Sequence, residues 1–443
     1  MKTFDNVYNR IMIKQHMDVF PSRDERLNPF SFYAKMRSHH HIEYDSKNEI
    51  WGIFRYSDSK EVLSNYEIFS SDIQRLTFLQ NKREKDKKRS KVKNKNDQNR
   101  YSQNDQVQTV RPSILTLDPP LQRQLRNVIS SAFTPNTIYN LKPRIEKTTN
   151  NLLDQVIERG QMDVIEDLAY PLPVTIIAEL LGVPYRDHDL FRQWADRLLG
   201  SNTNTTNFLD RNLEPLFRKV QNEMDSYFNI IIEKRKLNPQ NDLISNLIKA
   251  TVDSRRLTKD EILAFCSLLL LAGHVTTVNL IGNVIRTLLE YPKQFKKLKD
   301  EQNSLIPLTI EETLRYRSPV QALFRFLIKD SVFHGHKMKE GERVVIWIGS
   351  ANHDERVFQN SEEFDINRTP NDHIAFGYGI HFCLGSTLAK LEAEIVLSKV
   401  LDRLEDLRFD DDYSEDSLKP LYDVFLHGVS NLPVKFRSLR ISH

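Results

Sequence analysis

The segment from Thr258 to Glu290 constrains the fold of this chain more than any other feature. Thr258 and Glu261 form the Thr-x-x-Glu pattern of a helix-capping box, and Tyr291-Pro292 ends the helical pattern. At 1.5 Å per residue such a helix is about 45–50 Å long. Its centre, Leu268 to Gly273, is apolar on every face. We therefore expect this helix to cross the interior of the protein.

The composition predicts a globular protein without a membrane span. Hydrophobic residues make up 39% of the 443 residues and charged residues 28%, so a sizeable apolar core can form. The longest uninterrupted aliphatic stretch, Leu268 to Ala272, is far shorter than the roughly 18 apolar residues of a membrane span. The N-terminus lacks the charged-then-apolar pattern of a signal peptide. We expect a cytoplasmic protein.

The positive charge is concentrated in one segment. The net charge is +3, yet Lys82 to Lys95 alone contains nine basic and two acidic residues. The surrounding stretch, Gln80 to Gln108, has almost no apolar residues to offset the entropy of ordering, so we expect a mobile basic insertion within a single domain of residues 1–443. Because the segment lacks interleaved aromatic residues and a folded motif, we do not expect nucleic acid as a partner.

The remaining patterns predict a mainly α protein with a small β-rich region. Helices are expected at Asn140 to Arg159, Pro173 to Leu181 and Leu384 to Leu401, and Asp118-Pro-Pro marks a turn into another helix. A hairpin is expected at residues 42–56, and short strands at Lys329 to His334 and Arg343 to Ile348. The order has no βαβ rhythm and no internal repeat, which argues against a doubly wound fold.

Two features that could suggest metal binding are weak. Consecutive His39, His40 and His41 cannot all face one ion from a regular element. Only two cysteines occur, Cys266 and Cys383, so neither a disulfide framework nor a zinc site is expected. A lone cysteine is most often buried and unreactive, and this is the interpretation for Cys266.

The surroundings of Cys383 favour a different interpretation. Residues Phe376 to Gly385 have the sequence FGYGIHFCLG, and the glycines permit a tight loop around a flat ligand. Cys383 directly precedes the expected helix at Leu384 to Leu401, whose positive end and free backbone N–H groups would stabilise a thiolate. This arrangement indicates a soft, electron-donating metal ligand.

The stretch resembles the Phe-x-x-Gly-x-x-x-Cys-x-Gly haem-binding loop of the cytochromes P450, and the likeness extends from about Asn28 to Pro433. It is closest to soluble bacterial-type members. The resemblance implies the cytochrome P450 fold, haem b as cofactor, Cys383 as the axial ligand to iron, and Phe376 and Gly385 in the cofactor-binding loop. A thiolate ligand favours O–O cleavage, so a monooxygenase is expected. In relatives, the segment that corresponds to the basic insertion covers the pocket entrance.

The resemblance also assigns charged residues. Glu312 and Arg315 match the family's Glu-x-x-Arg pattern and are expected to form a structural triad with Arg368. Arg126, Arg325 and His381 are expected to bind the haem propionates, which suit cationic partners. Many relatives carry His where Gln122 stands and Arg where Gln124 stands, so the predicted propionate site has three groups.

The resemblance places oxygen activation on the long helix. Residues 272–277 match the oxygen-binding stretch, with Ala272 against the haem and Gly273, Thr276 and Thr277 as catalytic candidates. A helical Thr can bond back to the carbonyl four residues earlier, which opens a groove in the helix. Relatives usually carry Asp or Glu where Val275 stands, and valine cannot relay protons. Either protons take another route, through His274, Thr276, Thr277 and ordered water, or protonation is slow and reducing power is lost as peroxide.

The resemblance leaves the substrate open. Residues expected to line an apolar pocket are Leu269, Ala272, Thr276, Val320 to Leu323 (with Val320, Ala322 and Leu323 singled out), Phe425 and Leu426. Fatty acids, steroids and terpenoids all fit such a pocket. No Gly-x-Gly-x-x-Gly segment is present, so electrons are expected from another protein, such as a ferredoxin and its reductase. A peroxide-driven enzyme and a non-catalytic haem-based sensor are the alternatives.

Overall fold

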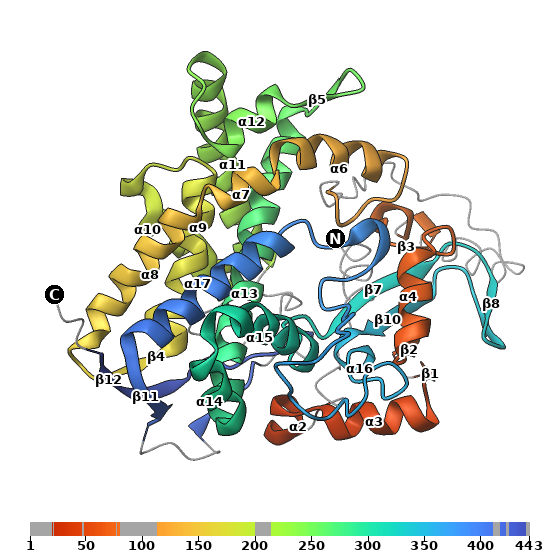
Figure 1. Cartoon of the computed structure of the whole chain (residues 1–443). Coiled ribbons are helices and arrows are strands. Elements are labelled where there is room, and N and C mark those ends of the chain that lie inside the picture. The colour runs from red at the N-terminus through yellow and green to blue at the C-terminus, as the bar shows by residue number, and fades with distance from the viewer. Residues whose placement is uncertain are drawn as a thin grey trace, which may run out of the picture.

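A long central helix, α13 (Lys259–Glu290), organises the molecule. The computed structural model describes residues 20, 22–46, 48–76, 78–79, 113–199, 214–410, 417–421 and 425–439. Figure 1 shows α13 in the middle of the helical side, with the larger sheet, α3 and α4 gathered on the other side. The expected insertion at residues 80–108 lies outside the described residues.

Helices make up most of the described chain. Those before the central helix are α2 (Arg23–Leu27), α3 (Phe30–His39), α4 (Tyr56–Ser64), α6 (Leu121–Ala132), α7 (Pro135–Tyr139), α8 (Lys142–Ile157), η2 (Val164–Ala169), α9 (Pro171–Leu180), η3 (Tyr185–Asp187), α10 (His188–Leu199), α11 (Glu214–Leu237) and α12 (Leu243–Lys249). Those after it are α14 (Pro292–Asp300), α15 (Gln302–Tyr316), α16 (Ile348–Ala351), η4 (Gly379–His381) and α17 (Ser386–Arg403).

The strands form small sheets. The largest has the order β1 (Ile42–Asp45), β2 (Ile50–Ile53), β10 (Arg343–Trp347), β7 (Ala322–Leu327), β3 (Phe69–Ser70), with β2 and β10 parallel and the other pairs antiparallel. A second sheet has the order β11 (Leu404–Phe409), β12 (Pro433–Ser438), β4 (Gln161–Asp163). Two-stranded ribbons are β5 (Thr251–Val252) with β6 (Arg255–Arg256), and β8 (Ser331–Phe333) with β9 (His336–Met338).

The structure confirms the predicted start and end of α13. The Thr258 side chain accepts from the Glu261 backbone N–H, and the Glu261 side chain accepts from the Thr258 backbone N–H, which completes the capping box. The hairpin predicted at residues 42–56 is formed by β1 and β2. Strand β7 was not predicted, because its sequence, Ala-Leu-Phe-Arg-Phe-Leu, has no clear alternation of apolar and polar residues.

The last long helix begins later than the sequence predicts. We expected it to begin at Leu384, whereas α17 begins at Ser386 with Gly385 as N-cap. Leu384 and Gly385 instead form a turn between Cys383 and the helix. A turn of two residues therefore separates Cys383 from the helix. This separation decides which backbone N–H groups lie near the cysteine sulfur.

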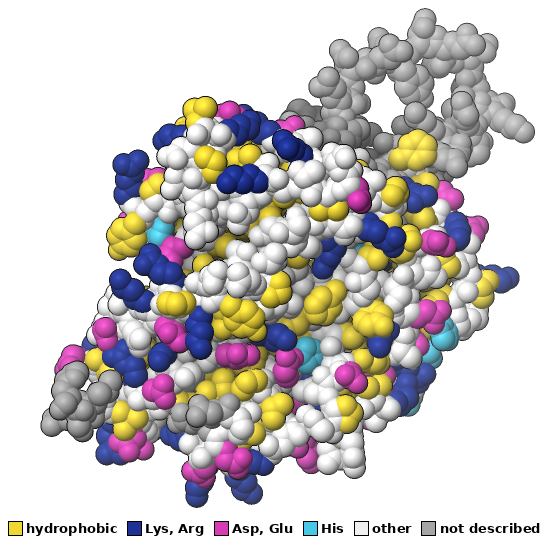
Figure 2. Space-filling model, turned by 45° about the horizontal axis from the view of Figure 1, so that its top comes forward, with side chains coloured by type: hydrophobic (Ala, Val, Ile, Leu, Met, Phe, Trp, Pro, Cys, Tyr) yellow, Lys and Arg dark blue, Asp and Glu magenta, His cyan; other side chains and the backbone are white. Residues whose placement is uncertain are grey.

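The main core surrounds α13, which contacts helices α9, α10, α11, α15 and α17. By length and composition α13 could cross a membrane, but 56% of its most apolar window is buried inside the protein, as in the core helix of a globular domain. A second core lies between the larger sheet and α4, and a third joins Tyr33, Phe54 and Trp347. Acidic and basic side chains are interspersed over the face shown in Figure 2.

Candidate functional site

The loop that carries Cys383 is closed by backbone hydrogen bonds. The N–H of Cys383 donates to the carbonyl of Phe376 at 2.9 Å, and the N–H of Gly377 donates to that of Ile374 at 2.9 Å. Gly377 and Gly379 have φ values of +75° and +72°, a region that side-chain-bearing residues rarely adopt. The glycine pattern in the sequence therefore has a geometric cause.

The two cysteines lie in opposite environments. The Cys383 side chain is accessible to water, although neighbouring protein atoms crowd the sulfur from the loop side. This burial raises the pKa of the Cys383 thiol, and the hydrogen bond from the Gly385 backbone N–H, the charge of Arg126 and the hydrogen bond from the Ser386 backbone N–H offset only part of the rise. Cys266 is fully buried inside α13, and burial raises the pKa of its thiol. Only Cys383 can meet a ligand.

Three positively charged or titratable groups gather beside this loop. Arg126 on α6 donates to the carbonyl of Phe382 at 2.6 Å, and His381 lies with its Nδ1 atom 3.0 Å from the carbonyl of Ile114. Arg325 on β7 is only 8% exposed and donates through Nη1 to the Phe324 carbonyl at 2.7 Å.

Burial dominates the electrostatics of these groups. Burial and the charges of Arg325 and Arg126 lower the pKa of His381 to about 4. Burial lowers the pKa of Arg325 to about 10, and the negative charge of Asp118 opposes it. The Nη2 atom of Arg325 and the Nε2 atom of His381 are buried and have no hydrogen-bond partner within the described part of the chain. A cationic site of this kind fits a ligand with carboxylates.

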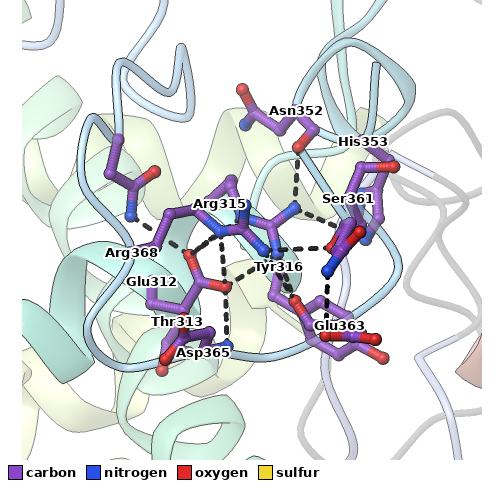
Figure 3. A network of polar contacts seen from close by, with 12 residues as sticks. Glu312, Thr313, Arg315, Tyr316, Asn352, His353, Ser361, Glu363, Asp365 and Arg368 are labelled. Carbon is purple, nitrogen blue, oxygen red and sulfur yellow. Dashed lines mark hydrogen bonds and ion pairs between the residues drawn. The ribbon is translucent and has the colours of Figure 1, made fainter. Parts of the chain in front are cut away.

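The predicted charged triad is assembled in the core. Arg315 donates to both carboxylate oxygens of Glu312 at 2.8 Å, and Arg368 donates through Nε at 3.1 Å. The Glu312 and Arg315 side chains are at most 1% exposed. As Figure 3 shows, Arg315 also reaches backbone carbonyls of the loop that follows α16, namely those of Asn352, Ser361 and Glu363. The triad thus ties α15 to the chain that leads to Cys383.

One side of α13 is open to water in the middle of an otherwise buried helix. Ala272 is exposed, and Val275 and Thr276 are half-buried on the same side. Thr276 donates its hydroxyl hydrogen to the Ala272 carbonyl at 2.7 Å. Thr277 is buried and donates to the Gly273 carbonyl at 2.9 Å. Of the two threonines, only Thr276 therefore shares the open side with Ala272.

Two neighbouring residues of α13 face away from that open side. A Cβ atom on Gly273 would lie 3.1 Å from the side chain of Ile177, so the glycine permits close packing against α9. His274 is fully buried, and its Nε2 donates to the Tyr170 carbonyl at 3.0 Å. Burial lowers the pKa of His274 to about 4. A proton route through His274 is therefore not favoured by its position.

The structure places the residues that were expected to line a substrate pocket in different parts of the protein. Successive side chains of a strand point to opposite faces, so Leu323 shares a face of β7 with Arg325, whereas Ala322 lies in the core around Trp347. This position corrects the expectation that Ala322 lines the pocket. Leu269 is 9% exposed. Val320 and Leu426 form an isolated β-bridge, which brings the C-terminal segment beside the chain that enters β7.

The structure gives partners to Gln122 and to two residues of the histidine run. Gln122, for which relatives often carry His, donates to the Ile380 carbonyl at 2.9 Å and so supports the cysteine loop. The histidine run separates as predicted, since His40 pairs with Glu43 and His41 with Asp58. No group of three or more His, Cys, Asp or Glu side chains that could hold a metal ion occurs among the described residues.

Sequence reasoning missed one charged cluster near the loop. His373 and Lys390 both contact Glu311, the residue before Glu312. The adjacent acidic pair in the sequence was the available signal. Its partners lie 62 and 79 residues further along the chain, so no local pattern could identify them.

Comparisons with known proteins show what the chain as a whole is similar to. The family model described as Cytochrome P450 matches residues 35–427. Cytochrome P450 109 of Bacillus spizizenii is 36% identical over 422 residues, which cover 95% of this chain and 94% of that protein. The cyclomarin C epoxidase CymV of Salinispora arenicola is 36% identical and covers 83% of this chain and 87% of its own length.

Solved structures show the same architecture. The crystal structure of substrate-free CYP109E1 from Bacillus megaterium has a TM-score of 0.82 and 39% identity, with 94% of this chain and 100% of that chain covered. The complex of CYP109E1 with testosterone has a TM-score of 0.79 and 37% identity, with 92% and 99% covered.

Proposed function

Since the chain belongs to the cytochrome P450 family, we propose that Cys383 is the axial ligand of its haem b and that the enzyme oxygenates apolar small molecules. The chain is an oxidoreductase of the monooxygenase class. The observation that supports the residue assignment most strongly is the water-accessible Cys383 thiol, which accepts two backbone N–H groups and lies near the buried guanidinium of Arg325 and the half-buried guanidinium of Arg126. Bound haem supplies oxygen activation, which a thiolate ligand favours.

The residues beside the loop fit this cofactor. Arg325 and His381 each have a buried nitrogen without a partner in the described part of the chain, and the haem propionates are carboxylates that would supply one. Arg126 lies near enough to lower the pKa of both His381 and the Cys383 thiol through its charge. We assign these three residues to the propionates, and Phe376 and Gly385 to the loop around the iron.

On the opposite side, we assign Ala272 and Thr276 to the face of α13 that borders the reaction site. The hydroxyl of Thr276 donates to the Ala272 carbonyl, so this carbonyl accepts a side-chain hydrogen bond from its own helix. Thr276 can hold a water or a polar ligand atom there. Thr277 and Gly273 support the groove from its buried side.

The proposed substrates are apolar molecules of up to steroid size. Leu323, Val320 and Leu426 are half-buried apolar side chains, and we assign them to the pocket with Thr276: Leu323 shares the Arg325 face of β7, and Val320 and Leu426 form a β-bridge with each other. A relative has been crystallised with testosterone and with corticosterone, which supports a pocket of this chemistry. Shape alone discriminates poorly among apolar ligands, so fatty acids and terpenoids belong to the same proposal.

We propose that electrons come from a separate ferredoxin and reductase, and that the enzyme acts in the cytoplasm as a single catalytic domain. The sequence has no dinucleotide-binding Gly-x-Gly-x-x-Gly segment of its own.

The carbon-monoxide complex of the reduced protein tests the proposal directly. A thiolate-type spectrum is expected in the purified protein and is to be followed by titration with steroids, fatty acids and terpenoids for a change of spin state. Turnover with a ferredoxin and reductase, but not with peroxide alone, would support the monooxygenase. A protein that contains haem but shows no thiolate spectrum would contradict the assignment of Cys383.

A further inference from the structure

A second carboxylate on α15 contacts both ends of the cysteine loop. Glu311 precedes Glu312, but its side chain points away from the charged triad and is 33% exposed. Its Oε2 atom lies 2.7 Å from Nε2 of His373, and its Oε1 atom lies 2.9 Å from Nζ of Lys390. His373 is ten residues before Cys383, and Lys390 is seven residues after it. One carboxylate thus joins the incoming chain to the outgoing helix.

The hydrogen bonds of His373 define its tautomer. Its Nδ1 accepts the backbone N–H of Ala375 at 3.3 Å, so the ring proton belongs on Nε2, where it is donated to Glu311. The imidazole side chain is only 6% exposed. A histidine held between a carboxylate and a second polar group has a fixed ring orientation, as for the histidines that surround metal sites.

The contact continues by backbone steps to the cysteine. Ala375 is followed by Phe376, whose carbonyl accepts the N–H of Cys383 at 2.9 Å. The Lys390 side of the contact lies on α17, one turn after Ser386, whose N–H bonds to the cysteine sulfur. Both limbs that set the position of the sulfur are therefore held by Glu311.

The electrostatics agree with a charged contact. Burial raises the pKa of Glu311, but the hydrogen bonds from His373 and Lys390 and the charge of Lys390 outweigh burial and lower the pKa to about 2. Glu311 is therefore ionised at neutral pH. Charge-assisted hydrogen bonds to an ionised carboxylate are stronger and more directional than neutral ones.

We infer that Glu311, His373 and Lys390 are positioning residues that clamp the two limbs of the Cys383 loop and keep the cysteine in the form that binds haem iron as a thiolate. The inference rests on the proposed role of Cys383. The clamp is distinct from the Glu312 triad, which holds α15 to the preceding loop, because the two carboxylates share no side-chain partner among the described residues.

Two substitutions separate the clamp from general packing. Glu311→Gln keeps the side-chain size but removes the charge that both partners use. His373→Asn retains a side-chain acceptor that can still bond two residues on to Ala375, but it is too short to reach Glu311. Lys390→Met tests the other limb. Glu43→Gln is the matched control, because Glu43 contacts His40 at 2.9 Å in an exposed pair on β1, at the edge of the larger sheet.

The readout is the rate at which the thiolate spectrum of the reduced, carbon-monoxide-bound holoenzyme is lost in mild denaturant, with helix content followed by circular dichroism. Glu311→Gln and His373→Asn should lose the spectrum about three- to tenfold faster than wild type, before the helices unfold. The double variant should be no faster than Glu311→Gln alone, since both remove one contact. Lys390→Met should show a smaller acceleration.

The outcomes distinguish this inference from the assignment of Cys383. Wild-type protein without a thiolate spectrum would contradict the assignment itself. If wild type shows a thiolate spectrum but Glu311→Gln and His373→Asn lose it no faster than the control Glu43→Gln does, only the clamp is overturned. Loss of the spectrum in step with helix unfolding, or additive effects in the double variant, would also overturn it. If Glu311→Gln fails to fold, His373→Asn decides by the same two measurements.

Discussion

On the cysteine side of the haem site, charged groups hold the chain in place, whereas on the α13 side apolar packing does. Glu312, Arg315 and Arg368 form a buried network, and Glu311 bridges two further segments. On α13 the polar contacts near the open face are hydroxyls of Thr276 and Thr277 that bond back to their own helix. The cysteine side is therefore built to hold one geometry, and the α13 side to present a surface.

This difference explains why the chemistry of the chain is easier to infer than its substrate. Hydrogen bonds and ion pairs need particular atoms at particular distances, so they leave particular residues in the sequence. An apolar face accepts many side chains of similar volume, so its residues say little about the molecule that they contact.

The largest effect is expected at the ligand. Cys383→Ala should abolish the thiolate spectrum and oxygenation, and Cys383→His should give an imidazole-type spectrum, because the sulfur donor is lost. Absorption spectra of the reduced carbon-monoxide complexes, with haem content measured alongside, check this.

Cys266→Ala is the control from the α13 side. It should leave the spectrum unchanged and cost only about 1 kcal/mol of stability, because it removes one buried atom from the core. A thiolate spectrum in Cys383→Ala would show that Cys383 is not the axial ligand.

The next largest effect compares buried polar groups on the two sides. Glu312→Gln leaves Arg315 buried without its charged partner, so the free energy of unfolding should fall by about 3–5 kcal/mol. Thr277→Val on α13 removes one hydroxyl that bonds within its own helix and should cost about 1 kcal/mol. Urea unfolding midpoints measure both. Equal losses in the two variants would contradict the contrast between the two sides.

Acid should affect His274 on α13 and Glu311 on α15 in two different pH windows. Burial lowers the pKa of His274 to about 4, below the value of about 6.5 in an unfolded chain, so the unfolded state binds the proton first. Stability should therefore fall by up to about 1.4 kcal/mol per pH unit as the pH drops from about 6.5 to 4. Burial also lowers the pKa of His381, in the cysteine loop, to about 4 and that of His427 to about 3, so both add to the same trend.

Glu311 acts in a lower window. Its pKa in the folded protein is about 2, so its stabilising contribution is present above the unfolded value of about 4.3 and is lost as the pH falls towards 2. Melting temperatures across the pH range should show a flatter upper window in His274→Gln and a flatter lower window in Glu311→Gln. A His274→Gln profile identical to wild type would exclude His274 as a source of acid sensitivity.

The smallest expected effect lies at Val275 on the α13 side. Relatives usually carry an acid there, and His274 points away towards Tyr170. Val275→Glu should raise the fraction of electrons that appears in product and lower peroxide release, since a carboxyl on the half-buried face can relay protons to the groove beside Thr276. Stability should change by no more than about 1–3 kcal/mol.

Val275→Gln, which is polar but cannot ionise, is the matched control for this change. Equal coupling in wild type and both variants, at unchanged haem content, would show that this position does not limit proton delivery.

Features that depend on short spacings could be predicted from the amino-acid sequence. The capping box at Thr258 and Glu261, the glycine-rich loop before Cys383 and the Glu312–Arg315 pair each lie within a few residues, where helix and turn geometry dictate which atoms meet. The structure confirms the geometry of all three.

The direction in which each side chain points depends on how the helices and sheets pack together. This packing turned Ala322 into the core, turned His274 towards Tyr170, left Ala272 open to water in a buried helix and brought His373 and Lys390 to Glu311. These contacts depend on segments that are far apart in the chain and meet only when α13, α15 and α17 pack together. No local pattern carries that information, because the packing of the whole core selects the partners.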